Sequence, residues 1–362
     1  MKTGTANLPL HGGKAPAWLF NRMVKLAGAV IEIIAEDSGP EEVLRKISDP
    51  FWFQALGCIL GFDWHSSGVT TTVCGAMKES MKGKERALGL FIAGGKGGAS
   101  RKTPKEIENA AMRTGCDGGS LVYASRMSAK VDSSAVQDGY QLYHHCFFFT
   151  LNGKWAVVQQ GMNDDNGYAR RYHWFSEKVA DFVEEPHTAI CCDDRKEALD
   201  MTAKQSDGAR RSSSSLSCED PAFWLKETEQ LKSLDLPARH QILKEDISSR
   251  YFSQIMLKTY EARPANFEKL LSMEGVGPKT IRSLSLLSEL IFGEKASYDD
   301  PARFSFAHGG KDRIPYPVDR ETYDRTTEIL NGWIGRAKVD TTEKVKASER
   351  LKRFLKPQLK IV

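Results

Sequence analysis

The spacing of apolar residues changes along the chain, and these changes predict the order of its elements. Apolar side chains recur every three or four positions over residues 16–36, which predicts an amphipathic helix that begins near Pro16. Residues 51–60 are apolar on nearly every side, so we expect them in the core. Helical spacing dominates again from residue 221 onward.

The middle of the chain has the character of β-strands. Residues 88–93 predict a buried strand, and residues 140–151 and 154–160 flank Asn152-Gly153, a strong signal for a two-residue hairpin turn. The patterns together predict an α+β protein. A mixed α/β amino-terminal domain with an antiparallel hairpin is followed by an all-α helix-hairpin-helix domain.

The hairpin turn also predicts a register. If Leu151 pairs with Lys154, His145 lies opposite Gln160. Consecutive strand residues alternate between faces, so His144 and His145 point to opposite sides of the sheet. Only one of the two histidines then faces a given cleft.

A change in composition divides the chain. Residues 193–219 lose aromatic side chains and gain charge and serine, which predicts a linker or exposed loop. This segment separates a catalytic domain, residues 1–192, from a helical domain, residues 220–362. A length of 362 residues is in keeping with two domains.

Residues 267–293 predict a helix, a tight turn and a second helix. Two glycines in the turn let the backbone approach a ligand closely, and the N–H groups that open the second helix point toward any anion there. The pattern resembles the helix-hairpin-helix motif, which grips the DNA backbone without reading sequence. The predicted DNA contacts are Gly275, Val276, Gly277, Lys279 and Thr280. Close packing of two helices is the structural alternative.

A second glycine-rich segment, residues 94–98, follows the first predicted strand and precedes a helix that begins at Thr103-Pro104. Such a loop suits phosphate binding, and we assign Lys96 and Arg101 to the DNA backbone. Its spacing departs from the Walker pattern, so no nucleoside triphosphatase is predicted. A flexible loop with solvated charges is the alternative.

Carboxylate, imidazole and amide groups gather around the predicted hairpin, and they are the ingredients of a site for Mg²⁺ or Mn²⁺. The predicted metal ligands are Asp63, Asp132 and Asp138, the predicted catalytic groups are His65, Asp138, His144 and His145, and Arg170 and Arg171 are expected to hold phosphates. An ordinary sheet with one polar, exposed face is the alternative.

Composition limits how the chain can bind DNA and in which compartment we expect it. The formal net charge is only +4, so a basic surface for DNA must be local. Seven cysteines without a Cys-x-x-Cys pair argue for reduced thiols in a cytoplasmic protein and against a zinc ribbon or an iron–sulfur cluster. We expect no signal peptide at the amino terminus and no membrane span, which needs roughly 20 apolar residues.

Five segments carry a resemblance to a known family: residues 7–16, 61–68, 137–145, 169–174 and 307–312. With them, nearly the whole chain resembles the prokaryotic family of unknown function DUF763. The resemblance implies a DNA-acting enzyme of the metal-dependent nuclease type, with a helix-hairpin-helix region. It implies no residue roles, so the residues named above are proposed on their chemistry.

A narrower resemblance links the carboxy-terminal region to the helix-hairpin-helix DNA glycosylases. In that family a lysine after the Gly-Val-Gly turn attacks the sugar, and an aspartate in a later Pro-Val-Asp segment assists it. Lys279 and Asp319 match these positions. The two lie farther apart here than in that family, and no cysteine cluster follows.

The sequence therefore predicts a metal-dependent DNA nuclease with a role in DNA repair, bound to the DNA backbone and to no membrane. One alternative is a glycosylase or lyase built on Lys279 and Asp319, which needs Lys279 partly desolvated. Another is a DNA-binding protein without chemistry. The choice of metal, the preferred DNA structure and the oligomeric state, with a homodimer among the options, stay open.

Overall fold

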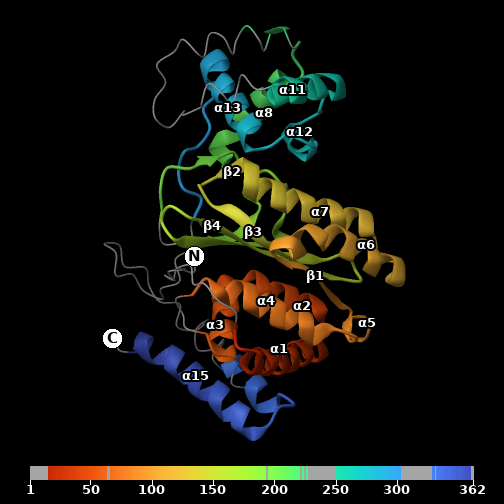
Figure 1. The fold of residues 1–362 in the computed structure, drawn as a ribbon, viewed down its shortest axis with the longest axis vertical. Coiled ribbons are helices and arrows are strands. Elements are labelled where there is room, and N and C mark those ends of the chain that lie inside the picture. Colours follow the sequence, from red (N-terminus) through yellow and green to blue (C-terminus); the bar gives the residue numbers. More distant parts are fainter. Residues whose placement is uncertain are drawn as a thin grey trace.

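The computed structural model describes residues 15–62, 66–192, 195–220, 222–223, 226, 250–302, 328–330 and 332–359. A central antiparallel sheet lies between two helical layers (Figure 1). This arrangement confirms the α+β prediction. No helix in the described part of the chain is long and apolar enough to cross a membrane.

The helices of the amino-terminal layer are α1 (Ala17–Ser38), α2 (Pro40–Ser48), α3 (Pro50–Leu60), α4 (Gly68–Met81) and α5 (Glu85–Leu88). Short-range signals place their ends. Gly39 ends α1 with a positive φ of 85°, and the Asp49 carboxylate caps α3 by accepting hydrogen bonds from the N–H groups of Phe51 and Trp52. α3 and α4 pack closely at Gly57, where a Cβ atom would lie 2.5 Å from Val69 Cγ1.

The described strands of the main sheet follow the order β1 (Leu90–Lys96), β3 (Gln141–Thr150), β4 (Trp155–Asn163), β5 (Tyr168–Phe175) and β6 (His187–Cys191), and all pairs are antiparallel. The strands at residues 88–93, 140–151 and 154–160 are thus confirmed. A small second sheet joins β2 (Val136–Gln137) to β7 (Leu199–Asp200).

The predicted register of the β3–β4 hairpin is wrong by one residue. His145 lies opposite Gln159, not Gln160. The connection spans residues 151–154, with Gly153 at a φ of 76°, so the hairpin takes a longer glycine-containing loop instead of a two-residue turn. The opposite orientation of His144 and His145 is confirmed, because His145 contacts Ser125 of α7 (Gly118–Lys130) and His144 lies beside Cys74 of α4.

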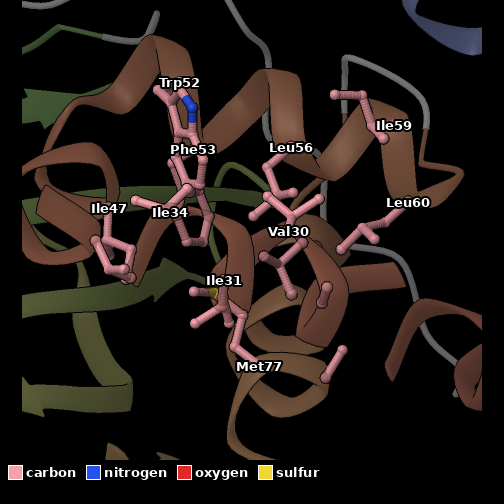
Figure 2. Close-up of a cluster of buried hydrophobic side chains, with 14 of the residues drawn as sticks. Val30, Ile31, Ile34, Ile47, Trp52, Phe53, Leu56, Ile59, Leu60 and Met77 are labelled. Atoms are coloured by element: carbon pink, nitrogen blue, oxygen red, sulfur yellow. The ribbon is translucent and has the colours of Figure 1, made fainter. Parts of the chain in front are cut away.

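Each face of the sheet packs into its own apolar cluster. The first cluster joins the even-numbered β3 residues Cys146 and Phe148 to α1–α4 and to carboxy-terminal residues such as Leu351 of α15 (Thr341–Leu359). Figure 2 shows its centre, where Trp52 and Phe53 of α3 lie above Ile31 of α1 and Met77 of α4.

The second cluster covers the opposite face. It joins Phe147, Phe149 and Trp174 of the sheet to α6 (Thr103–Thr114) and α7 (Gly118–Lys130), and further to α11 (Arg250–Ala262), α12 (Phe267–Ser272) and α13 (Pro278–Phe292). The carboxy-terminal helices therefore share a core with the sheet, as their position beyond α7 in Figure 1 indicates.

The prediction of a linker at 193–219 needs correction. This stretch contains β7 and α8 (Asp207–Leu216), whose Ala209 and Leu216 belong to the second cluster. Arg210 of α8 is buried and donates to the carbonyl oxygens of Met201 and Ala203 at 2.9 and 2.7 Å. The serines that suggested a loop are accommodated because one face of α8 packs against α13.

Candidate functional site

A pocket of about 250 Å³ opens where α7 and the start of α6 meet β3 and β4. It brings together two regions that the sequence singled out separately, the paired histidines and Arg101, which follows the glycine-rich segment. Its lining residues are Ser100, Arg101, Thr103, Pro104, Ser125, Arg126, Ala129, Leu142, Tyr143, His144, His145 and Gln159.

Gly94 makes this convergence possible. Its φ is +88°, and a Cβ atom there would lie 2.2 Å from the His145 carbonyl oxygen, so the position requires glycine. The Gly94 N–H donates to Glu106 Oε2 at 2.8 Å, and Lys78 Nζ donates to the same oxygen at 2.6 Å. These bonds tie the end of β1 to α6 and set the turn η1 (Gly97–Lys102), which carries Arg101, beside the pocket.

A buried chain of hydrogen bonds runs inward from the pocket wall. Ser125 Oγ lies 2.9 Å from His145 Nε2, and His145 Nδ1 lies 2.8 Å from Gln159 Oε1. Gln159 Nε2 donates to Asp132 Oδ2 at 2.5 Å. Asp132 lies in η2 (Val131–Ala135), directly after α7, so its position follows from that helix.

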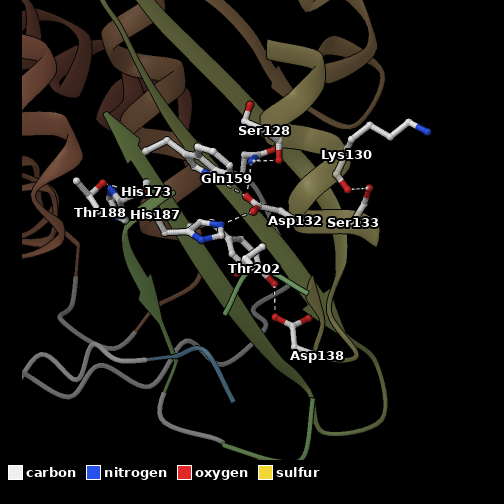
Figure 3. A network of polar contacts seen from close by, with 12 residues as sticks. Ser128, Lys130, Asp132, Ser133, Asp138, Gln159, His173, His187, Thr188 and Thr202 are labelled. Atoms are coloured by element: carbon white, nitrogen blue, oxygen red, sulfur yellow. Dashed lines mark hydrogen bonds and ion pairs between the residues drawn. The ribbon is translucent and has the colours of Figure 1, made fainter. Parts of the chain in front are cut away.

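Asp132 anchors the inner end of this chain. Its Oδ1 lies 2.5 Å from His187 Nε2, and its Oδ2 also accepts from Trp174 Nε1 at 3.0 Å. Figure 3 shows Asp132 between Gln159 and His187. Burial raises the pKa of the Asp132 carboxyl, and His187 opposes that rise.

This chain of hydrogen bonds determines which ring nitrogen of His145 carries the hydrogen. Gln159 Nε2 faces a carboxylate and the Ser128 carbonyl oxygen, both acceptors, so Gln159 Oε1 is the atom that faces His145. His145 Nδ1 therefore carries the hydrogen, and Nε2 accepts from the Ser125 hydroxyl. Burial lowers the pKa of His145 to about 4, so the ring is neutral at pH 7. The arrangement gives Ser125 a hydrogen-bonded base.

Arg170 and Arg171 are buried, and we correct the expectation that they hold phosphates. The Arg170 guanidinium donates to Asp138 Oδ2 at 2.9 Å and to Asp300 Oδ2 at 2.7 Å. Arg171 donates to Gln54 Oε1 at 2.9 Å on the other face of the sheet. Neither guanidinium faces solvent, so both stabilise the fold from inside.

The predicted carboxylate metal site does not assemble among the described residues. Asp138 Oδ2 accepts from Arg170 and from the Tyr172 hydroxyl at 2.7 Å, and the Asp132 oxygens have the partners given above. Asp63 and His65 lie outside the described residues. Within the described ranges, the one group of three or more His, Cys, Asp or Glu side chains that could hold a metal ion is Cys74, His144 and Cys146.

Helices α12 and α13 form the predicted helix, turn and helix. Gly275 in the turn has a φ of +91°, and Gly277 precedes Pro278, the first residue of α13. Lys279 is exposed. Val276 and Thr280 have buried side chains, so only their backbone can meet a ligand.

The turn is fastened to the end of α7. Lys130 Nζ donates to the carbonyl oxygens of Met273 (3.1 Å) and Val276. On its other side, Gln137 Nε2 donates to the Pro278 carbonyl oxygen at 2.8 Å, and Arg282 Nε donates to Gln137 Oε1 at 2.8 Å. These bonds use carbonyl groups of the turn and hold it in a defined position.

For the glycosylase alternative, Asp319 lies outside the described residues. Lys279 lies at the surface, whereas the glycosylase alternative needs this lysine partly desolvated. Lys96 and Arg101 are exposed, as a phosphate contact requires; Arg101 lines the pocket, and Lys96 lies over the ring of Tyr143, another lining residue.

The sequence missed Ser125, Arg126, His187, Cys74 and Cys146 as functional candidates. A single serine or arginine on an amphipathic helix carries no distinguishing signal. One usable signal was present: the spacing of His144 and Cys146 puts both side chains on one face of a strand.

The chain was compared with known protein families, curated proteins and solved structures. The family model described as "Protein of unknown function (DUF763)" matches residues 4–318. No curated protein and no solved structure matches the chain.

Proposed function

We propose that this chain, which belongs to the DUF763 family, binds the DNA backbone through the α12–α13 turn and hydrolyses a phosphodiester in the neighbouring pocket. The observation that carries the proposal is the double role of α7. Its last residue, Lys130, holds the turn, and its residues Ser125 and Arg126 line the pocket.

The spacing along α7 suits a single DNA strand. Arg126 and Lys130 are four residues apart, about 6 Å along a helix axis. A DNA strand carries one phosphate about every 3.4 Å of duplex axis, so neighbouring phosphates can reach the turn and the pocket together. The N-cap residue of α13 is Gly277, which has no side chain to cap the N–H groups at the start of the helix.

Inside the pocket, Arg101 and Arg126 supply positive charge for the phosphate oxygens. Ser125 Oγ attacks phosphorus while its proton passes to His145 Nε2. The bond from phosphorus to the leaving DNA oxygen breaks, and that oxygen takes the proton from His145. A water molecule then hydrolyses the phosphoserine. Gln159 and Asp132 hold the imidazole in the required tautomer throughout.

Mg²⁺ or Mn²⁺ is part of this proposal as an ion that shields the phosphate charge. We assign no protein ligands to it, since Asp132 and Asp138 are engaged by protein donors. We also place the protein in the cytoplasm, in agreement with its seven cysteines, which are all described and form no disulfide. A role in DNA repair remains part of the proposal, through the backbone-binding turn.

The test is a panel of labelled single-stranded, duplex, branched and bubbled DNAs incubated with Mg²⁺, Mn²⁺ or a chelator. Ser125→Ala is expected to lower cleavage at least about 100-fold, the scale of a lost nucleophile or base. Ser128→Ala is the matched control. It is a buried serine of the same helix whose hydroxyl donates to the Ser125 carbonyl oxygen and not to His145.

Binding is tested separately with Gly277→Ala. A Cβ atom there would lie 3.9 Å from the nearest atom, the Gly275 carbonyl oxygen, so the fold tolerates it while the methyl group obstructs a phosphate. We expect weaker, still salt-dependent DNA binding. If the DNA stays intact under every condition, the nuclease proposal is wrong and only a DNA-binding role remains. If borohydride traps a covalent DNA adduct and Lys279→Ala abolishes it, the activity is that of a lyase and not of a nuclease.

A further inference from the structure

We propose that Cys74, His144 and Cys146 bind a zinc ion between α4 and β3. This site is independent of the proposed DNA chemistry and uses the opposite face of the sheet from His145. One ligand atom from each residue lies within 4.8 Å of the other two, and all three residues are buried.

Secondary structure brings these groups together without a sequence motif. His144 and Cys146 are two positions apart on β3, so their side chains point to the same face. Cys74 comes from α4, which packs on that face in the first apolar cluster. Neither cysteine forms a disulfide.

His144 supplies the second, independent observation. Its side chain is buried with 1% of the residue exposed, and neither ring nitrogen has a hydrogen-bond partner among the described residues. An imidazole buried in this way loses its bonds to water and gains none in return, which costs free energy. A metal ion bound to one ring nitrogen offsets this cost.

The donor set selects the class of metal. Two thiolates and one imidazole suit zinc, and this set with one open position is known from catalytic zinc sites. Thiol ligands lose their protons when they bind a metal ion, so zinc binding at this site would release protons. Zinc with two thiolates and a neutral imidazole carries no net charge, which suits a buried position.

The usual bond lengths of zinc agree with this assignment. Zinc–sulfur bonds of about 2.3 Å and zinc–nitrogen bonds of about 2.0 Å separate ligand atoms on a tetrahedral ion by about 3.5 Å. Separations of up to 4.8 Å need only a small contraction.

The experiment uses the full chain, purified under reducing conditions, incubated with zinc and dialysed, with metal content measured by mass spectrometry. We expect about one zinc per chain. Cobalt in place of zinc should give a thiolate-to-metal charge-transfer band. Cys74→Ser and Cys146→Ser should each remove that band. Cys191→Ser, another fully buried cysteine next to Arg171, is the matched control and should keep it.

A further measurement on the unaltered chain covers the case in which a variant fails to fold. Zinc should protect Cys74 and Cys146 from alkylation in mild denaturant, as mapped by peptide mass spectrometry, and leave Cys116 unprotected. The inference is overturned by a chain that binds no zinc, by a cobalt band that survives Cys74→Ser, or by a Cys74–Cys146 disulfide in place of metal.

Discussion

His144 and His145 are adjacent in the sequence and both buried, yet they differ in what surrounds them. His145 faces α7, and both its ring nitrogens have partners, Ser125 and Gln159. His144 faces α4, and neither nitrogen has a partner among the described residues. Its neighbours there are two thiols.

The difference separates two kinds of buried polar residue. A fully satisfied imidazole is held in one tautomer and can act on the atom that it contacts, here the Ser125 hydroxyl. An unsatisfied imidazole beside two thiols is suited to a ligand that brings its own charge. Successive positions of β3 therefore carry, on opposite faces, the histidine bonded to Ser125 and the histidine of the proposed zinc site.

The largest expected effect on stability comes from removing Asp132, which anchors the hydrogen bonds around His145. Asp132→Ala leaves Gln159, Trp174 and His187 without their shared acceptor. We expect a loss of about 3–5 kcal/mol in the free energy of unfolding, measured by urea denaturation. Asp164→Ala, on an exposed loop, is the control and should change stability by less than about 0.5 kcal/mol. An equal small effect of both variants would refute the anchoring role.

Acid should destabilise the protein through both histidines. Their folded pKa values of about 4 for His145 and about 3 for His144 lie below the value of about 6.5 for an unfolded histidine. The unfolded state then binds protons first, so stability is full above pH 6.5 and falls as the pH drops toward 4. The loss approaches about 3 kcal/mol per histidine; the raised pKa of Asp132 acts in the opposite direction.

Urea midpoints between pH 7.5 and pH 4 in the presence of a chelator measure this loss. His144→Leu should show a shallower pH dependence than the unaltered chain, because one depressed histidine is gone. An unchanged slope would contradict the neutral, buried state of His144.

A smaller effect distinguishes the two histidines at pH 7.5 directly. In chelator, His145→Leu is expected to cost about 1–3 kcal/mol, since it leaves Ser125 and Gln159 with unpaired polar atoms. His144→Leu removes two unpaired nitrogens and should be near neutral. Adding zinc should stabilise the unaltered chain and not His144→Leu. Equal costs for the two variants would remove the contrast between the faces.

Local patterns were enough to predict much of this molecule. The strands, the helix that begins at Thr103, the turn between α12 and α13 and the opposite orientation of His144 and His145 all follow from spacing over a few residues. These features depend on backbone geometry within one element, which a short stretch of sequence determines.

Long-range packing decided the rest. Arg170, Arg171, Asp132 and Asp138 have the residue types of a phosphate and metal site, but each is buried and hydrogen-bonded to other groups of the protein. The segment at 193–219 became part of the core because α13 covers α8. Polar composition cannot distinguish an exposed charge from a buried and paired one.

The sequence by itself therefore determined which elements form, which β3 residues share a face, and that the chain belongs with DUF763. The tertiary structure decided which helix each face meets. Ser125 and Cys74 are 20 and 72 positions from the β3 residues they approach, His145 and Cys146. Contacts over such distances arise only when helices dock on the sheet, and no local pattern records them.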